Sequence, residues 1–191
     1  MEPTMLTKYK ETVAPGLKEK FQYGNVHQIP RIQKVVLNSS FGRAEDRKSA
    51  AEIVMEDIAT ITGQRPVPTV SKKAISNFKL RTGDTIGARV TLRNRIMWEF
   101  LDRFINIATP TIRDFRGVSF KSFDGNGNYT IGIADHSIFP EIELDKVRRT
   151  VGFDVTIVTS AKTDEEAREL LTLLGMPFRK QAKKTEEAAA A

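Results

Sequence analysis

The chain has 191 residues, a net charge of +6 and no cysteine, and 40% of its residues are hydrophobic. This composition suffices for a buried core, and it excludes disulfides, thiolate metal sites and a cysteine nucleophile. The sequence has no apolar run long enough for a transmembrane helix, and its first residues lack the apolar segment of a secretion signal, so we expect a cytoplasmic protein without a membrane partner.

Charge is distributed unevenly along the chain. The segment 65–95 contains eight basic residues and one acidic residue, whereas the segment 135–169 contains nine acidic and five basic residues. A cationic stretch of this kind favours a nucleic-acid partner, because lysine and arginine neutralise phosphates. The alternative is a solvated surface of mixed charge.

The periodicity of apolar residues predicts helices and strands in an irregular alternation. In chain order the predicted elements are a helix over 4–23, a strand over 32–41, a helix over 47–62, an extended edge piece over 66–70, a strand over 85–93, a helix over 94–108, a hairpin over 118–134, a strand over 153–160 and a helix over 164–174. Pro15-Gly16 is expected to kink or restart the first helix, and Asn94 and Thr163 are expected to cap theirs. Residues 181–191 form a low-complexity tail that we expect to be disordered.

This order of elements predicts one α+β domain over residues 1–180, because no strand–helix–strand unit repeats. In the strand over 85–93, apolar residues alternate with Arg89, Thr91 and Arg93. Asn38 occupies the outward position of the earlier strand. We therefore expect a mostly antiparallel sheet with helices packed on one face and the other face open to RNA.

Three candidate sites for a metal or for RNA do not match the residues that such sites require. The run DGNGNYTIGIAD begins like a calcium loop, but Tyr129 occupies the sixth position, where the sharp turn requires glycine. The run RGVSFKSF matches half of an RNA-recognition signature, and packing explains its Phe120 and Phe123 better. Two histidines cannot complete a zinc site and no base–nucleophile pair is visible, so we expect no metal, no cofactor and no enzyme.

The stretch SKKAISNFKLRTGDTIGARVTLR, residues 71–93, carries six basic residues with apolar residues between them. Four of the cations fall in a loop, and two fall on the strand that follows. Both groups are suited to phosphates, and arginine also recognises guanine edges. Phe78 either stacks on an exposed base or packs beneath the loop, whereas Ile75 and Leu80 are expected to pack.

The chain resembles the bacterial large-subunit ribosomal protein five family, which anchors 5S rRNA. The matching segments are RIQKVVLN, ITGQRPV, ISNFKLRTGDTIGARVTLR, MWEFLDR, IRDFRGVSFKSFDGNGNYTIG, IFPEIELDKV and PFRK. They follow one another in order from about residue 5 to residue 180. Pro15-Gly16, where the family's first helix is usually uninterrupted, and the tail beyond Lys180 depart from the family pattern.

The resemblance implies an α+β domain in the central protuberance, with its open sheet face against 5S rRNA. The implied rRNA-contacting residues are Asn38, Gln64, Arg65, Phe78, Arg89, Thr91 and Arg93. The resemblance also implies that a basic loop at about 72–84 reaches P-site tRNA through Lys72, Lys73, Ser76, Asn77, Lys79 and Arg81. Part of the segment 110–148 would touch a small-subunit head protein in an intersubunit bridge, and large-subunit rRNA and neighbouring large-subunit proteins would complete the partners.

Two other functions are weighed against a structural rRNA-binding protein. An RNA-modifying enzyme or RNA chaperone of α+β form would need a pocket with convergent acids, bases or metal ligands, and no such set is evident in the sequence. A basic protein of the membrane surface would need an amphipathic cationic helix, which is also absent from the pattern. Cofractionation with large subunits through a high-salt wash would separate a structural ribosomal protein from a free enzyme or chaperone.

Overall fold

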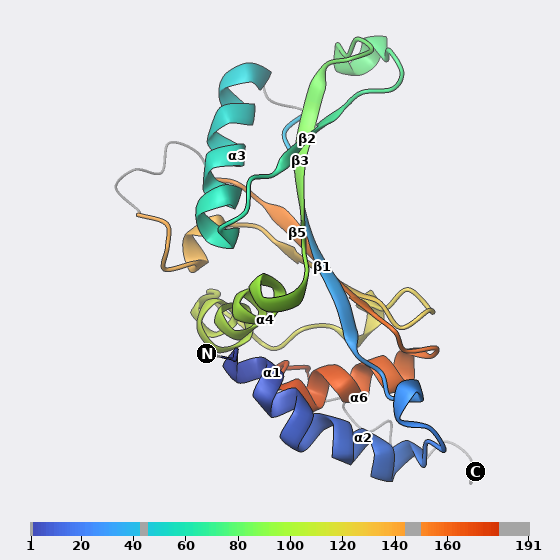
Figure 1. Ribbon diagram of the computed structural model, residues 1–191. Helices are drawn as coiled ribbons and strands as arrows, with labels where there is room; N and C mark the ends of the chain where they lie inside the picture. Colours follow the sequence, from blue (N-terminus) through green and yellow to red (C-terminus); the bar gives the residue numbers. More distant parts are fainter. Residues whose placement is uncertain (1, 43–45, 144–149, 180–191) are drawn as a thin grey trace, which may run out of the picture.

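The computed structural model describes residues 2–42, 46–143 and 150–179 (Figure 1). Its centre is a five-stranded sheet with the order β2-β3-β1-β5-β4, in which each neighbouring pair is antiparallel. The strands are β1 (Ile32–Ser40), β2 (Val67–Val70), β3 (Thr85–Leu92), β4 (Tyr129–Ile133) and β5 (Phe153–Thr159). The predicted strands therefore form, except for the first arm of the hairpin, and β2 lies at an edge, as Pro66 before it and Pro68 within it indicate.

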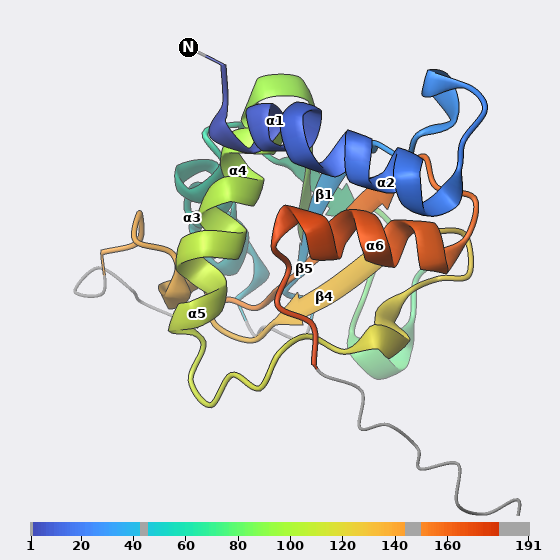
Figure 2. The same cartoon turned by 90° about the horizontal axis from the view of Figure 1, so that it is seen from below.

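The helices gather on one side of this sheet, as Figures 1 and 2 show together. They are α1 (Thr4–Lys8), α2 (Ala14–Phe21), α3 (Arg47–Thr62), α4 (Asn94–Arg103), α5 (Thr109–Thr111) and α6 (Asp164–Leu174). Their apolar faces and the inner face of the sheet share one cluster of buried residues, which includes Leu37, Ile58 and Leu170. The predicted α+β class, with helices on one face, is confirmed.

The alternation of β1 and β3 decides which face of the sheet is buried. Val35 and Leu37 of β1 and Val90 and Leu92 of β3 are buried. The residues between them point to the other face, which carries no helix in the described part of the chain (Figure 1). Period-two patterning therefore predicted the open face correctly.

Both prolines within helices follow a π-helical turn. Tyr9–Val13 and Phe104–Ala108 each form such a turn, and the residue before the proline, Ala14 or Thr109, donates to a carbonyl five residues back. The wider turn accommodates a proline that lacks an N–H and would clash with the carbonyl four residues back. The interruption predicted at Pro15 is therefore a widened turn inside a continuous helical segment. The helical segment that begins with α4 likewise continues through its π-helical turn and past Pro110 into α5, whereas the sequence pattern predicts that this helix ends before Pro110.

Two local predictions are wrong. The first arm of the hairpin over 118–134 is a 3-10 turn, Phe120–Ser122, that touches the second arm through a single bridge between Phe123 and Tyr129. Asn94 does not cap α4: its φ is 51°, and Arg93 occupies the N-cap position without a side-chain bond. By contrast, Thr163 caps α6 as predicted, since its side chain accepts from the backbone N–H of Glu166.

The Gly/Asn-rich turn after Phe123 is stabilised by carboxylates. Asp124 accepts the backbone N–H groups of Asn126 and Asn128 at 2.9 and 3.0 Å, and Asp164 accepts those of Gly125 and Gly127. The Asn128 side chain also donates to Asp124, at 2.7 Å, and this bond, followed by the two backbone bonds to Asp124, lowers the pKa of the Asp124 carboxyl. Within the described ranges no group of three possible metal-ligating side chains occurs, and no helix is long and apolar enough to cross a membrane.

Candidate nucleic-acid interface

Two rows of side chains cross the open face from strand to strand. In the first row, Thr91 of β3 lies opposite Val36 of β1, and Val36 lies opposite Thr156 of β5. Thr130 of β4 completes the row, and its hydroxyl lies 3.1 Å from that of Thr156. The predicted contact set omits Thr130 and Thr156, although the alternation of β4 and β5 would have placed both here.

The second row carries the charge. Arg89 lies opposite Asn38, and Asn38 lies opposite Asp154 on the next strand, followed by Gly132. Arg89 and Asp154 are exposed, and Asn38 is half-buried. Neither row contains an aromatic side chain, so this face offers amide, hydroxyl and guanidinium groups, beside the single carboxylate of Asp154, rather than a platform for stacked bases. Such groups are suited to the sugars and phosphates of a folded RNA.

Gln64 joins this face from the end of α3. Its side-chain nitrogen donates to the carbonyl of Thr91 at 3.3 Å, which fixes the amide beside the first row. Arg93 follows β3 directly and is exposed, as is Arg65 next to Gln64. The structure therefore brings together six of the seven predicted rRNA-contacting residues around β1 and β3.

The loop between β2 and β3 forms a small hairpin that projects beyond the rest of the molecule (Figure 1). Ile75 and Leu80 exchange backbone hydrogen bonds of 3.0 and 3.1 Å around a 3-10 turn. At its base, the Asp84 carbonyl accepts the N–H of Ser71, and the Asp84 carboxylate accepts that of Arg81, both at 2.8 Å. The predicted tRNA-contacting residues of this loop are all exposed: Lys72, Lys73, Ser76, Asn77, Lys79 and Arg81.

The apolar residues of this loop do not form the expected cluster beneath it. Phe78 is 57% exposed and Ile75 is 43% exposed, so the prediction that Ile75 packs is wrong, whereas Leu80 is half-buried. The tip extends away from the core, which leaves these side chains without an apolar surface to cover them. Their exposure makes Phe78 available for stacking on a base.

Phe78 is separated from the other predicted rRNA-contacting residues. It lies at the tip with Lys79, whereas Arg93 lies beyond the opposite end of β3. A strand rises roughly 3.3 Å per residue, so the eight residues of β3 place about 20 Å or more between them. The cations of the stretch 71–93 thus form two surfaces, the tip of the loop and the open face of the sheet.

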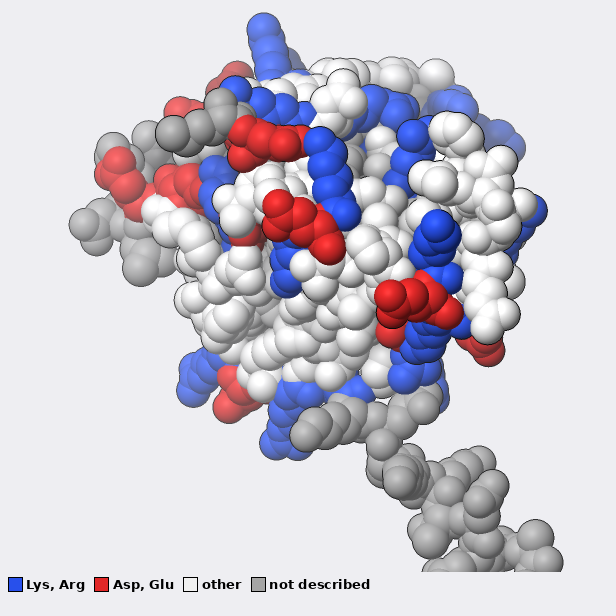
Figure 3. All heavy atoms as spheres, turned by 60° about the horizontal axis from the view of Figure 1, so that its bottom comes forward, with Lys and Arg blue, Asp and Glu red and all other residues white. Residues whose placement is uncertain are grey.

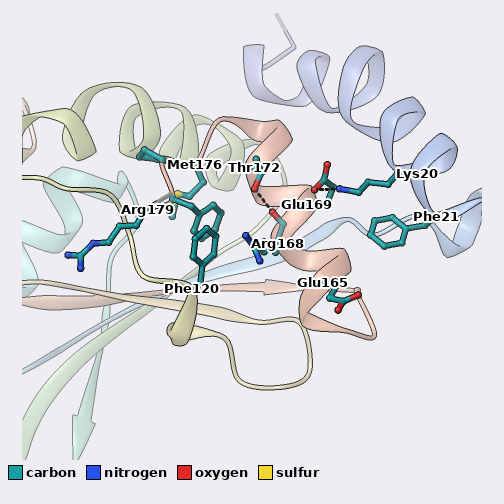
Figure 4. A pocket seen from close by; sticks show the side chains of 11 residues that line it. Lys20, Phe21, Phe120, Glu165, Arg168, Glu169, Thr172, Met176 and Arg179 are labelled. Carbon is teal, nitrogen blue, oxygen red and sulfur yellow. Dashed lines mark hydrogen bonds and ion pairs between the residues drawn. The ribbon is translucent and has the colours of Figure 1, made fainter. Parts of the chain in front are cut away.

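The helix-covered side has a different character. Figure 3 shows lysines and arginines beside acidic residues there. A cavity of about 610 Å³ opens between α2, α6 and the segment after α6 (Figure 4). Four of its charged groups are engaged with protein: Lys20 pairs with Glu169 at 2.6 Å, the Arg168 guanidinium lies 3.8 Å from the ring centre of Phe120, and Arg179 donates to the Gly117 carbonyl at 2.9 Å. Glu165 is the one lining carboxylate without a partner among the described residues. This cavity therefore lacks the free, convergent acid and base of an active site.

The histidine at position 136 has a packing role. It is 1% exposed, and its Nδ1 accepts the backbone N–H of Val151 at 3.1 Å. The other ring nitrogen, Nε2, lies 3.5 Å from the Asp57 carboxylate on α3. Burial raises the pKa of Asp57, and the His136 ring acts in the opposite direction. This contact places the segment around residue 136 against α3, and the buried Asp57 Oδ2 has no hydrogen-bond partner among the described residues.

Comparison with known proteins matches nearly the whole described chain. A family model described as ribosomal protein L5 matches residues 25–81, and a second, which describes the C-terminus of the same ribosomal family, matches residues 85–178. The chain belongs to the ribosomal L5 family. Relatives named large ribosomal subunit protein uL5 include those of Halothermothrix orenii and Chlorobaculum tepidum, each 56% identical, over 89% and 91% of this chain and 95% and 94% of their own. That of Clostridium botulinum is 51% identical over 93% of this chain and 99% of its own.

Membership of the ribosomal L5 family confirms the resemblance drawn from the sequence. It also confirms the expectation of a structural ribosomal protein of the large subunit rather than an enzyme. The individual contact residues stay predictions, and the geometry groups them into the open face and the loop tip. The predicted tail, residues 181–191, lies outside the described residues.

Proposed function

We propose that this ribosomal L5 family protein binds 5S rRNA with the open face of its sheet and attaches that RNA to the central protuberance of the large subunit. The observation that carries the proposal is the helix-free face on which Asn38, Arg89 and Thr91 stand side by side, with Gln64 fixed at its margin. Large-subunit rRNA and neighbouring large-subunit proteins surround the domain. The protein acts in the cytoplasmic ribosome.

The composition of this face supports a folded RNA as the partner. Threonine hydroxyls and the Asn38 amide can donate to and accept from ribose hydroxyls and phosphates. Arg89 and Arg93 add charge-assisted hydrogen bonds, which are shorter and stronger than neutral ones. The contact set on this face is Asn38, Gln64, Arg65, Arg89, Thr91 and Arg93.

The loop tip contacts P-site tRNA in this proposal. Its four cations are exposed, and Phe78 is exposed among them. The tip projects from the end of the sheet, so it can reach an RNA that the open face does not touch (Figure 1). Because of its position, Phe78 belongs with the tRNA-contacting residues and not with the rRNA-contacting ones.

Part of the segment 110–148 contacts a protein of the small-subunit head in an intersubunit bridge in this proposal. Arg103 of α4 pairs with Glu141 and donates to the carbonyl of Ile61 at 3.0 Å, which fixes this segment against α3 and α4. The acidic excess after Asp135 is complementary to a basic partner. Residues 144–148 of the predicted bridge region lie outside the described residues.

Filter binding to 5S rRNA tests the sheet-face proposal. Arg93→Ala should weaken binding by about 1–3 kcal/mol, and Thr91→Arg should also impair it by crowding the first row. Lys18→Ala on α2 is the matched control, since Lys18 is exposed on the helical side and the substitution removes the same charge. If both sheet variants bind 5S rRNA as the parent does, the face is not the binding surface.

A further inference from the structure

A residue outside the loop fixes the conformation of its tip. Arg47 lies in the first turn of α3, far before Phe78 in sequence. Its Nη2 donates to the carbonyls of Phe78 and Lys79 at 2.9 and 3.0 Å, and its Nη1 pairs with the Asp84 carboxylate at 3.1 Å. One guanidinium therefore connects the tip of the loop, the base of the loop and α3.

The planar fork of arginine is what makes this connection possible. Three acceptors lie around one guanidinium, and its donors are fixed relative to one another. The same Asp84 oxygen that pairs with Arg47 also accepts the backbone N–H of Arg81 at 2.8 Å. Lys79, whose carbonyl is one of the acceptors, has a left-handed backbone with φ 51°, which a non-glycine residue adopts only when its surroundings impose it.

Hydrogen bonds must fix this tip because apolar packing does not. Phe78 and Ile75 are more than two-fifths exposed, whereas only 23% of the Arg47 side chain is exposed. A short hairpin without an apolar surface beneath it is at best marginally ordered. Ordering it at the moment of binding would reduce affinity through the lost conformational entropy, so a loop that is ordered beforehand binds more tightly.

We propose that Arg47 is a positioning residue for RNA binding by the loop, acting on Phe78 and Lys79 without touching the RNA itself. The ligand is an RNA with an accessible base and neighbouring phosphates: the base stacks on Phe78 and the phosphates pair with the loop cations. This inference rests on the proposed contact between the loop and P-site tRNA. It adds that α3, through Arg47, determines the orientation of the loop tip toward the RNA.

The test compares Arg47→Ala and Arg47→Lys with Lys48→Ala. Lys48 is the next residue of α3, and its exposed side chain makes no hydrogen bond within the described ranges, so this control removes one charge without changing the loop. Large subunits reconstituted with each protein are assembled into ribosomes, and dissociation of tRNA from the P site is measured at several salt concentrations. Hydrogen exchange of the free proteins measures the protection of the backbone amides of Ile75, Leu80 and Arg81, which are hydrogen-bonded within the loop.

Arg47→Ala should weaken tRNA binding about tenfold and speed exchange of the three loop amides, while the amides of β3 keep their protection. The salt dependence of tRNA binding should be the same for Arg47→Ala as for the parent, because an arginine that is bonded to protein releases no counterion from RNA. Arg47→Lys should resemble Arg47→Ala, since one ammonium cannot serve three separated acceptors. Lys48→Ala should resemble the parent in every measurement.

Each contrary result has a distinct meaning. Parental tRNA retention by Arg47→Ala, or unchanged loop exchange, refutes the positioning role. A reduced salt slope, or full rescue by Arg47→Lys, identifies Arg47 as a direct phosphate contact and overturns the inference as stated. If the parent itself makes no difference to tRNA retention compared with ribosomes that lack the protein, the proposed tRNA contact fails, and the RNA role of Arg47 fails with it.

Discussion

Neutralising the loop should separate the two RNA-binding surfaces of this protein. The variant replaces Lys72, Lys73, Lys79 and Arg81 with glutamine and leaves the cations of the open face in place. All four side chains are exposed, and within the described part of the chain none of them forms an ion pair with an acidic residue. We expect binding to 5S rRNA to persist and retention of P-site tRNA to fall.

The size of the effect follows from the number of cations. Each phosphate contact contributes roughly −0.7 to −0.9 to the slope of log affinity against log salt concentration. Four contacts therefore contribute a slope of about −3, so a threefold rise in salt should weaken the parent about thirtyfold more than the variant. The difference between the two proteins should shrink as salt rises, which an effect on folding would not reproduce.

Two assays on one set of proteins decide the matter. Filter binding of the isolated protein to 5S rRNA reports the open face, and tRNA dissociation from reconstituted ribosomes reports the loop. Arg89→Gln with Arg93→Gln is the converse variant and should lose 5S rRNA first. If the loop variant loses 5S rRNA and keeps tRNA, the stretch 71–93 is one continuous rRNA clamp and the division between tip and sheet is wrong.

Three further substitutions test single features. Phe78→Ala should leave the free energy of unfolding within about 0.5 kcal/mol of the parent but weaken tRNA retention by about 1–3 kcal/mol, because the ring is exposed and available for stacking. Gly87→Ala should cost about 1–3 kcal/mol in urea unfolding, since its Cβ would lie 2.7 Å from the Ser39 carbonyl and the Thr69 hydroxyl. Burial raises the pKa of Asp57 in the folded protein above its unfolded value of 3.8. The contribution of Asp57 to the free energy of unfolding is therefore fully present below pH 3.8 and is lost as the pH rises through the pKa that Asp57 has in the folded protein. Asp57→Asn should remove this part of the pH dependence of urea unfolding.

The strands and their faces could be predicted because their signal is local. In β3 the apolar and polar residues alternate without a break, so the buried face and the position of Thr91 follow from a period of two. Asn38 follows from the same pattern in β1. The helix ends at Gly63, Thr163 and Gly175 are equally local, because a cap needs only residues within one turn.

The features that the sequence patterns did not predict depend on residues distant in the chain. Phe120 leaves the expected strand because its ring stacks on Phe178, with ring centres 5.0 Å apart. The hydrogen bond from Arg47 to the Phe78 carbonyl joins residues that are separated in the sequence by most of α3 and by β2. The apolar character of Ile75 predicts that it packs, but the loop projects from the molecule and leaves Ile75 exposed. The π-helical turns have no clear local signal apart from the prolines that follow them.

Crosslinking of the purified protein to total RNA, with sequencing of the attached RNA and mapping of the crosslinked peptides, tests the central claim most directly. The account predicts that 5S rRNA is recovered and that its crosslinks lie on peptides from β1, β3 and the end of α3. Recovery of 5S rRNA on peptides of α2 and α6 alone, or recovery of no 5S rRNA, would contradict the claim that the open sheet face is the binding surface.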